Sequence, residues 1–370
     1  MKLLFYVPQM AAYGGMERHV CVLAEEAARR GHHVRLLTTS NSLNEATRTL
    51  IKASGVDLRE LPRQRDEASQ FHKAWWLWRE TLAAHLTRWD IIYTNGQSAL
   101  ASIVWHAASN DSRIIHHHHT AADAGEQATW APRFRKVLAT VPELVSCSEA
   151  TRANIERAVG RQGTRFLPYF SACPVGPGTV TEKPHRPGQP LKFGFAGRLV
   201  RTKGLDMICA LSLRPELADV SWQIYGAGPD YTAEYFHAYP NICYHGSYPD
   251  LAGYGRTLLD LDALALFSQH NEGMPLSLIE AMSAGLPWIA SDRGGTRELA
   301  RDAANCVLVQ NPADLDACLR DTLELVQRLR TGATSRLRQR AVYDRYFAAN
   351  VVAKQWFDYL ETPPDRPASS

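Results

Sequence analysis

The chain has 370 residues, of which 45% are hydrophobic and 21% are charged. These values are ordinary for a globular protein, and this length exceeds what one hydrophobic core usually supports, so we expect two domains. The formal net charge of +3 is too small to indicate nucleic acid as a partner. Residues 1–180 contain 21 Lys and Arg against 16 Asp and Glu. This mildly basic half is compatible with an anionic membrane surface, although a solvated face is the favoured interpretation.

Cysteine usage and the N-terminal residues bear on the compartment. The seven cysteines are scattered and none has C-x-x-C spacing, which disfavours a disulfide framework and a structural zinc site. The apolar run at the N-terminus stops at Pro8 and is too short for a signal peptide. No stretch approaches the ~20 apolar residues of a membrane span. The sequence predicts a cytoplasmic protein, with peripheral contact to the cytoplasmic face of the inner membrane as an option.

Short apolar strands alternate with helices along the first half of the chain. Residues 3–7, "LLFYV", have the composition of a buried strand, and a helix is expected from about Met16 to Arg30, stopping at Gly31. Further strands are predicted at "HVRLLTT", "DIIYTN", "SRIIHHHHT" and "ELVSCS". This alternation is typical of a doubly wound parallel sheet with helices on both faces.

A Pro- and Gly-rich segment interrupts the pattern. Residues 171–190 contain five prolines and three glycines, a composition that indicates a linker. After it, "LKFGFAG", "SWQIYGAG", "ICYHG", "LDALALF", "LPWIAS" and "ANCVLV" predict a second parallel sheet. The predicted fold is therefore α/β, with two Rossmann-like domains facing a cleft that binds ligands at the carboxyl ends of the strands. The predicted boundaries are 1–172, a linker over 173–190, 191–345, a C-terminal helix over 346–361 that returns to the first domain, and a disordered tail over 362–370.

Glycines and two basic residues follow the first strand of the second domain. The segment "GFAGRLVRTKG" contains Arg198 and Lys203, which can flank a diphosphate that the glycine backbone approaches closely. Taken alone, a basic surface turn is the favoured interpretation. The segment "IYGAGPD" has G-x-G at Gly226 and Gly228, but Tyr231 replaces the third glycine. Because neither the dinucleotide fingerprint nor a P-loop motif occurs, NAD binding and ATP hydrolysis are disfavoured.

Two glutamates flank a predicted helix start. In "HNEGMPLSLIEAMSAG", Glu272 precedes and Glu280 lies within a helix that begins near Pro275, a residue well suited to a first turn. A diphosphate held at the positive end of this helix, with a carboxylate on each flank, suits a nucleotide-sugar. A surface helix that carries both glutamates by chance is the alternative. The N–H groups expected to bind the anion belong to Leu276, Ser277 and Leu278.

This stretch resembles the E-x7-E motif of retaining glycosyltransferases with the two-domain GT-B fold, in family 4 (glycosyl transferases group 1). The similarity extends along nearly the whole chain. "YGGMERHV" resembles the family's N-terminal glycine loop, "FAGRLVRTKGLD" its phosphate-binding segment, and "IYGAGP" and "HGSYPD" the loops that line the nucleotide base. "GLPWIASDRGGTREL" resembles the strand and turn after the glutamates. Five ordered segments make a more specific match than E-x7-E alone.

The resemblance implies a role for each matched residue. Arg198 and Lys203 would neutralise the donor diphosphate, and Glu280 would contact the ribose. Glu272 would contact the transferred sugar, and His119 would orient the reacting centre, which makes these two the predicted catalytic residues. No metal or other cofactor is implied, because the family works without one.

Loop residues complete the implied site. Gly14 and Gly15 would bring backbone N–H groups of the first domain to the phosphate or the acceptor. Where relatives often have a Pro-Asn-Gly turn, this chain has Tyr169 and Phe170, so no donor contact is predicted there. The remaining assignments are Gly15, Leu276 and Ser277 to the diphosphate, Gly14, Gly273 and Met274 to the sugar and acceptor loop, and Gly226, Gly228, Ser247 and Tyr248 to the base pocket.

Four consecutive histidines, His116 to His119, raise the alternative of a metal site. Side chains alternate along a strand, so only two of the four can share a face. Two histidines rarely satisfy a tetrahedral ion, and no nearby carboxylate cluster completes a site. Metal binding is therefore disfavoured, and packing is the simpler role for one or two of them.

An aromatic stripe at helical spacing is predicted in "FHKAWWLWRETLAAHLTRW". The favoured interpretation is a helix whose apolar stripe faces the core of the first domain. The alternative is a surface that contacts membrane or a lipid-linked acceptor, because tryptophans interleaved with Lys and Arg suit that interface. Trp76, which lies off the stripe, is the residue expected to discriminate between them. The stripe consists of Phe71, Trp75, Trp78, Leu82, Leu86 and Trp89.

The implied function is that of a retaining hexosyltransferase that moves a sugar from a nucleotide-sugar to a glycan or lipid-linked glycan, in the synthesis of polysaccharide, lipopolysaccharide or another glycoconjugate. No carboxylate is clearly placed as a covalent nucleophile, so the leaving phosphate would accept the acceptor's proton. A nucleotide-sugar epimerase on the same fold is the alternative, but it would need further carboxylates and histidines. A non-catalytic sensor is disfavoured because the donor residues form a full set. Nothing specifies uridine, guanosine or adenosine.

Overall fold

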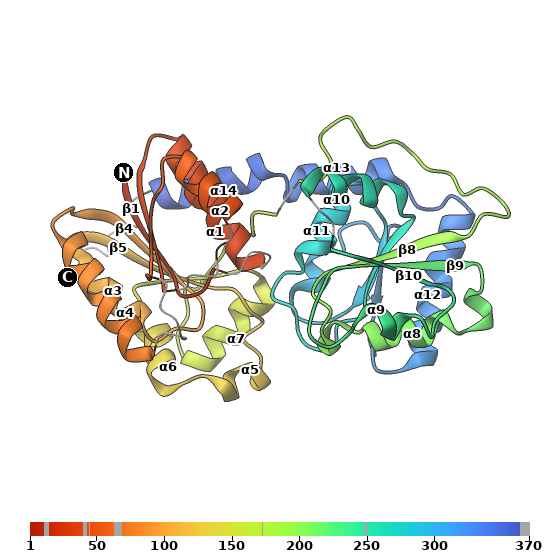
Figure 1. Ribbon diagram of the computed structural model, residues 1–370, viewed down its shortest axis with the longest axis horizontal. Coiled ribbons are helices and arrows are strands. Elements are labelled where there is room, and N and C mark those ends of the chain that lie inside the picture. The colour runs from red at the N-terminus through yellow and green to blue at the C-terminus, as the bar shows by residue number, and fades with distance from the viewer. Residues whose placement is uncertain are drawn as a thin grey trace. The chain divides into compact units, whose positions relative to one another are not determined.

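The computed structural model describes residues 1–10, 15–39, 43, 45–62, 69–171, 173–247 and 250–362 (Figure 1). The chain forms two compact units, the first made of Met1–Phe170 with Val352–Ser370 and the second of Ser171–Val351. Each unit has one parallel sheet with helices on its faces, the α/β architecture that the alternation of strands and helices predicted.

The first unit has a seven-stranded sheet in the order β3-β2-β1-β4-β5-β6-β7. Every pairing between neighbouring strands is parallel. The order reverses between β1 and β4, so the loops that follow these two strands diverge there. Such a switch point is where doubly wound sheets bind ligands. The strands are β1 Lys2–Val7, β2 His33–Thr38, β3 Asp57–Glu60, β4 Trp89–Asn95, β5 Ala108–His118, β6 Glu143–Ser146 and β7 Arg165–Phe166.

Two apolar layers bury the faces of this sheet. On one face, side chains from α1, α2 and α14 pack against the strands. On the other face, α3, α4, α6 and α7 do so, and Figure 1 shows these two groups of helices on opposite sides of the strands. The helices are α1 Gly15–Arg29, α2 Glu45–Ala53, α3 Gln70–His85, α4 Ala101–Val104, η1 Trp105–Ala107, α5 Ala124–Thr129, α6 Pro132–Thr140, α7 Glu149–Val159 and α14 Ala349–Glu361.

The second unit has a six-stranded parallel sheet in the order β10-β9-β8-β11-β12-β13. Its order reverses between β8 and β11, which repeats the arrangement of the first unit. The strands are β8 Leu191–Ala196, β9 Val220–Tyr225, β10 Ile242–Gly246, β11 Ala263–Leu266, β12 Trp288–Ser291 and β13 Cys306–Val309. The helices are η2 Arg201–Lys203, α8 Leu205–Ser212, η3 Pro215–Leu217, α9 Ala233–Phe236, α10 Leu251–Asp260, α11 Leu276–Ser283, η4 Gly295–Leu299, α12 Leu315–Arg330 and α13 Arg336–Tyr346.

Residues at the predicted boundaries pack with one unit or the other. In the segment predicted as a linker, Val175 and Val180 are buried, and the Lys183 ammonium lies 2.8 Å from an Asp262 carboxylate oxygen of the second unit. The C-terminal helical pattern is two helices, α13 and α14, separated at residues 347–348. The Arg340 guanidinium of α13 donates to the carbonyl oxygens of Val175 and Ser283 in the second unit, whereas α14 contributes to the core of the first.

The predicted orientation of the aromatic helix is wrong. The face of α3 that packs on the sheet consists of Trp76, Leu77, Thr81 and Ala84. Apolar residues line both sides of this helix, and spacing alone does not tell which side meets the sheet. Of the residues predicted to face the core, only Trp89, which belongs to β4, is buried. The others are exposed: Phe71 by 76%, Trp75 by 58%, Trp78 by 47%, Leu82 by 57% and Leu86 by 88%.

This orientation predicts opposite outcomes for two adjacent tryptophans. Trp76→Ser removes a side chain that is 6% exposed, and truncation of a buried Trp costs about 3–5 kcal/mol. For a unit of this size the melting temperature should fall by about 10 °C, whereas Trp75→Ser should leave it nearly unchanged. Thermal unfolding followed by circular dichroism measures both. Equal losses for the two variants would contradict the orientation of α3.

Candidate functional site

The loops after β8, β11 and β12 pack tightly against one another at the carboxyl edge of the second sheet. Gly204 has a φ of 75°, and a Cβ there would lie 1.9 Å from the carbonyl oxygen of Phe267. Gly294 has a φ of 59°, and a Cβ there would lie 2.0 Å from the carbonyl oxygen of Glu272. Only glycine suits these positions. The two glycines thereby allow three loops to converge on the segment that carries Glu272.

Glu272 lies at this convergence and forms an ion pair with Lys203. The Lys203 ammonium is 2.7 Å from Oε1 and 2.9 Å from Oε2 of the carboxylate, and the Glu272 side chain is only 9% exposed. The Ser268 hydroxyl also donates to Oε1, and His270 Nε2 lies 3.6 Å from the same oxygen. Burial raises the pKa of Glu272, but Lys203, His270 and Ser268 together bring it below its ordinary value. Ser268 and His270 were not among the predicted site residues.

Helix α11 begins at Leu276, four positions after Glu272. Pro275 is its N-cap residue, and the Leu278 N–H donates to the Pro275 carbonyl at 3.1 Å. The prediction that Leu278 offers a free N–H is therefore wrong, because the first turn is tight. The N–H groups of Leu276 and Ser277 make no hydrogen bond within the part of the chain that the structure describes. They remain available at the positive end of the helix.

The other predicted residues of this region occupy different settings. Gly273 and Met274 are buried between Glu272 and α11, and Glu280 is buried in the helix itself. Arg198 is exposed at the end of β8. Its guanidinium makes no ion pair or hydrogen bond with any described residue. Among the described residues Arg198 is thus an unpaired cation, whereas the charge of Lys203 is matched by Glu272.

The loops predicted to line a nucleotide base follow β9 and β10. The Gly226 N–H donates to the Gly246 carbonyl at 2.8 Å, and the Gly226 carbonyl accepts from the Tyr244 hydroxyl at 3.0 Å. These bonds hold the two loops together. Gly228 follows in the first loop and Ser247 is exposed in the second. Tyr248 lies outside the described residues.

The first unit has its own pocket, of about 410 Å³, at its switch point. Residues that follow β1, β4 and β5 line it, together with the start of α3. Among the described residues of the lining, Lys73, half-buried on α3, is the one formally charged side chain. The lining consists of Pro8, Gln9, Met16, Thr39, Gln70, Lys73, Gly96, Gln97, Ser98, Leu100, His118, His119 and Thr120. Gly15 is exposed at the start of α1, next to Met16, and Gly14 lies outside the described residues.

His119 is buried and neutral. Its Nδ1 lies 2.7 Å from the Tyr169 hydroxyl, which also donates to the His119 carbonyl oxygen at 2.7 Å. Because the hydroxyl has one proton, Nδ1 donates to Tyr169 and Nε2 carries the lone pair. Burial lowers the pKa of His119 well below its usual value. Nε2 is itself buried and has no partner among the described residues.

The four histidines divide between the two faces of β5. His117 and His119 lie on one face with ring centroids 4.0 Å apart, and His116 and His118 contact Phe134 on the other. In the described part of the chain, no three His, Cys, Asp or Glu side chains are placed to hold a metal ion. Turnover without a metal stays a prediction.

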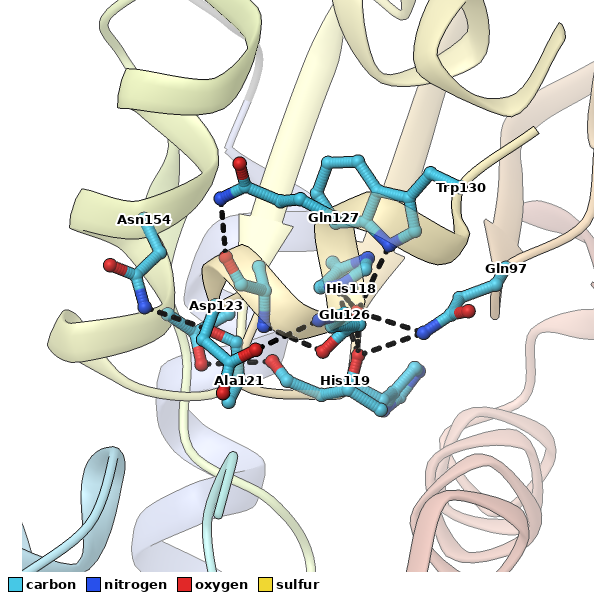
Figure 2. Close-up of polar contacts among 12 residues, drawn as sticks. Gln97, His118, His119, Ala121, Asp123, Glu126, Gln127, Trp130 and Asn154 are labelled. Atoms are coloured by element: carbon cyan, nitrogen blue, oxygen red, sulfur yellow. Dashed lines mark hydrogen bonds and ion pairs between the residues drawn. The ribbon is translucent and has the colours of Figure 1, made fainter. Parts of the chain in front are cut away.

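A carboxylate that sequence reasoning missed organises the pocket wall. Glu126 Oε1 lies 2.9 Å from His118 Nε2 and accepts from Gln97 at 2.8 Å, while Oε2 accepts from the Ala122 N–H at 2.8 Å. Figure 2 shows these groups and Trp130 converging on Glu126. Burial raises its pKa, but His118 above all, together with the Thr120 hydroxyl and the Ala122 N–H, lowers it to about 2. The Asp123 side chain caps α5 by accepting from the Glu126 N–H at 2.9 Å, so a D-x-x-E helix-start signal was present in the sequence.

The ion pair between Lys203 and Glu272 predicts non-additive stability. Lys203→Met leaves a buried carboxylate unpaired and should cost about 1–3 kcal/mol, whereas the same change in a Glu272→Gln background should cost less. The pKa of Glu272 is lower in the folded than in the unfolded chain. Its ionised carboxylate therefore stabilises the fold at pH values above the unfolded-state pKa, and this contribution is lost as pH falls through the folded-state pKa. The cost of Lys203→Met should therefore be larger at pH 7 than at pH 4.

Chemical denaturation of the four proteins of this cycle at both pH values measures the coupling. The matched control is Lys192→Met, because Lys192 forms an exposed ion pair with Asp260. Its cost should be small at either pH. Additive effects of Lys203→Met and Glu272→Gln would contradict the pairing.

The helices of the described residues include none long and apolar enough to cross a membrane. Two family models match the chain: "Glycosyltransferase Family 4" over residues 13–166 and "Glycosyl transferases group 1" over residues 190–327. Among proteins with curated functions, none matches at a significant level.

Solved structures with similar folds cover nearly the whole chain. Anabaena Alr3699/HepE, solved with UDP and glucose, is 19% identical with a TM-score of 0.73, over 98% of this chain and 100% of that one. Sucrose-phosphate synthase from Thermosynechococcus elongatus is 18% identical with a TM-score of 0.76, over 97% and 98%. The lipopolysaccharide outer core galactosyltransferase WaaB is 16% identical with a TM-score of 0.72, over 98% and 99%.

No comparison supports the epimerase alternative. Both halves of the chain match glycosyltransferase models, and the similar solved structures include the galactosyltransferase WaaB and the glycosyltransferase WaaG. The chain belongs to the group 1, family 4 glycosyltransferases of the GT-B fold, and it is a sugar-transferring enzyme.

Proposed function

We propose that this enzyme transfers a sugar from a nucleoside diphosphate sugar to a hydroxyl of a glycan or lipid-linked glycan, with retention of the anomeric configuration. The observation that carries the proposal is the buried ion pair of Lys203 and Glu272 at the start of α11. UDP in HepE and the lipopolysaccharide substrate class of WaaB support a nucleotide donor and a cell-surface glycan product. The cytoplasm is the proposed compartment.

The diphosphate is proposed to bind between the loop after β8 and the first turn of α11. Lys203 has three N–H donors, and the two carboxylate oxygens of Glu272 take two of them. The third can donate to a phosphate. Because Glu272 balances the charge of Lys203, the surplus positive charge comes from Arg198 and from the free N–H groups at the helix start. The proposed mechanism needs no divalent metal.

The two glutamates are proposed to act on different parts of the donor. Glu272, held ionised by Lys203, faces the transferred sugar, where positive charge develops at the anomeric carbon as the bond to phosphate breaks. Glu280 binds the ribose hydroxyls, which do not change during the reaction. The loops of Gly226, Gly228, Ser247 and Tyr248 are proposed to hold the base, and Gly273 and Met274 to shape the sugar subsite.

The acceptor is proposed to bind the pocket of the first unit, beside the start of α1 with Gly14 and Gly15. There His119 belongs to the lining, Gln97 and Thr120 can hydrogen-bond to sugar hydroxyls, and Lys73 favours an acceptor with a negative charge. In the transfer step, the acceptor oxygen bonds to the anomeric carbon on the face that the phosphate leaves. The electron pair of the broken bond goes to the phosphate oxygen, which then takes the acceptor's proton.

The roles of the two glutamates predict distinct kinetic changes. Glu280→Ala removes an interaction that binds the ground state and the transition state equally, so it should mainly raise the donor KM. Glu272→Gln removes an interaction that is stronger in the transition state, so it should mainly lower kcat. A charge-assisted hydrogen bond is worth about 1.5–3 kcal/mol, so each effect should be roughly ten- to hundredfold. Steady-state kinetics with one donor and one acceptor measure both.

A matched control is Glu324→Gln, because Glu324 is an exposed glutamate of α12 paired with Arg328, and it should leave both constants unchanged. The wild type should also keep its turnover after exhaustive chelation. If Glu272→Gln changed only the donor KM, Glu272 would be a binding residue. Activity that vanished with chelation and returned with one added metal would overturn the metal-free mechanism.

A further inference from the structure

Helix α3 exposes a continuous apolar stripe. This α3 stripe consists of five side chains that are each 47–88% exposed: Phe71, Trp75, Trp78, Leu82 and Leu86. They recur every three or four residues, so they form one line of about 22 Å along the helix. The rings of Trp75 and Trp78 stack on each other at 5.5 Å. Of the ten exposed large hydrophobic side chains among the described residues, five belong to this stripe, so it is a patch and not scatter.

The opposite side of α3 fixes the stripe toward solvent. Trp76, Leu77 and Ala84 are buried in the layer that covers the sheet, and Ser69 caps the helix by accepting from the His72 N–H. A rotation that buried the stripe would expose Trp76 and Leu77 instead. The exposed stripe is therefore a stable feature of the first unit that its own core does not use.

The helices of the layer that contains α3 carry more cationic than acidic side chains. Lys73 and Arg79 lie on α3, and the one acidic residue of that helix, Glu80, is paired with Arg79 at 2.9 Å. Helix α6 belongs to the same layer on the sheet, and Figure 1 shows it on the same side as α3. It exposes Arg133 and Lys136 and contains no acidic residue. An apolar line together with a surplus of cations is the composition of a surface that binds anionic lipid.

We propose that the face formed by α3 and α6 docks on an anionic lipid bilayer, with the α3 stripe entering the interface between headgroups and acyl chains. Tryptophan suits this depth because its ring is apolar and its N–H is polar. A second copy of the chain is a poorer occupant, since a two-fold contact would place the same cations opposite each other. Lys73 also lines the pocket of the first unit, so docking would bring that pocket to the membrane surface. That consequence rests on the proposed function, whereas the docking does not.

Co-sedimentation of the full chain with vesicles tests the proposal. The chain should bind vesicles that contain phosphatidylglycerol more tightly than pure phosphatidylcholine, and added salt should weaken the binding. Trp75→Ser with Trp78→Ser should weaken binding about tenfold or more. Arg133→Gln with Lys136→Gln should weaken binding only to the anionic vesicles.

A matched pair of leucines controls for general loss of surface apolarity. Leu82 in the stripe and Leu213 in the second unit are both 57% exposed, so Leu82→Ser should weaken vesicle binding and Leu213→Ser should not. Thermal unfolding verifies that each variant folds. Slow hydrolysis of nucleotide-sugar without acceptor should be the same in the double tryptophan variant, which separates docking from catalysis.

Three results would overturn the proposal. The chain could fail to bind anionic vesicles, or the double tryptophan variant could bind them as tightly as the wild type. The third is self-association in gel filtration that the double tryptophan substitution abolishes without any vesicle binding, because the stripe would then be an interface between copies.

Discussion

A buried carboxylate has to be paired, and at the carboxyl edge of the second sheet that requirement joins Glu272 to Lys203. The pair forms only when three loops lie close together, and the glycines at 204 and 294 permit these loops to approach one another. The lysine therefore positions the glutamate as much as it supplies charge. Lys203, predicted to bind phosphate, and Glu272, predicted to bind the sugar, form one ion pair. Ser268 and His270 also contact its carboxylate.

The same topology serves both units. Each sheet reverses its strand order once, between β1 and β4 and between β8 and β11, and the diverging loops leave room for a ligand. Among the described residues, the pocket of the first unit is lined by one cation and by neutral polar side chains, whereas the second unit has the ion pair and a helix start. We infer that the first suits hydroxyl-rich ligands and the second suits a diphosphate, because the available donors and charges differ.

Sequence reasoning found the two sheets and the order of the motifs, because alternating strands and glycine loops leave local signals. It placed Glu272, Lys203 and the start of α11 in one region, but it did not find that the first two bind each other, since a contact across 69 positions has no local signature. It missed Glu126, although four of its five donors lie within residues 118–130 and only Gln97 comes from another segment. It also predicted the wrong buried face for α3, because both sides of that helix carry aromatic residues. Only the packing against the sheet decides which side is buried.

Hydrogen–deuterium exchange with and without added nucleoside diphosphate tests the central claim that the pair and the helix start form the donor site. UDP, GDP and ADP would be compared, because the base pocket does not specify one. We expect at least one of them to slow exchange at residues 197–204 and 268–280, with no comparable change in the peptides of β1, β4 and β5. Protection confined to the first unit, or none with any of the three nucleotides, would contradict this account.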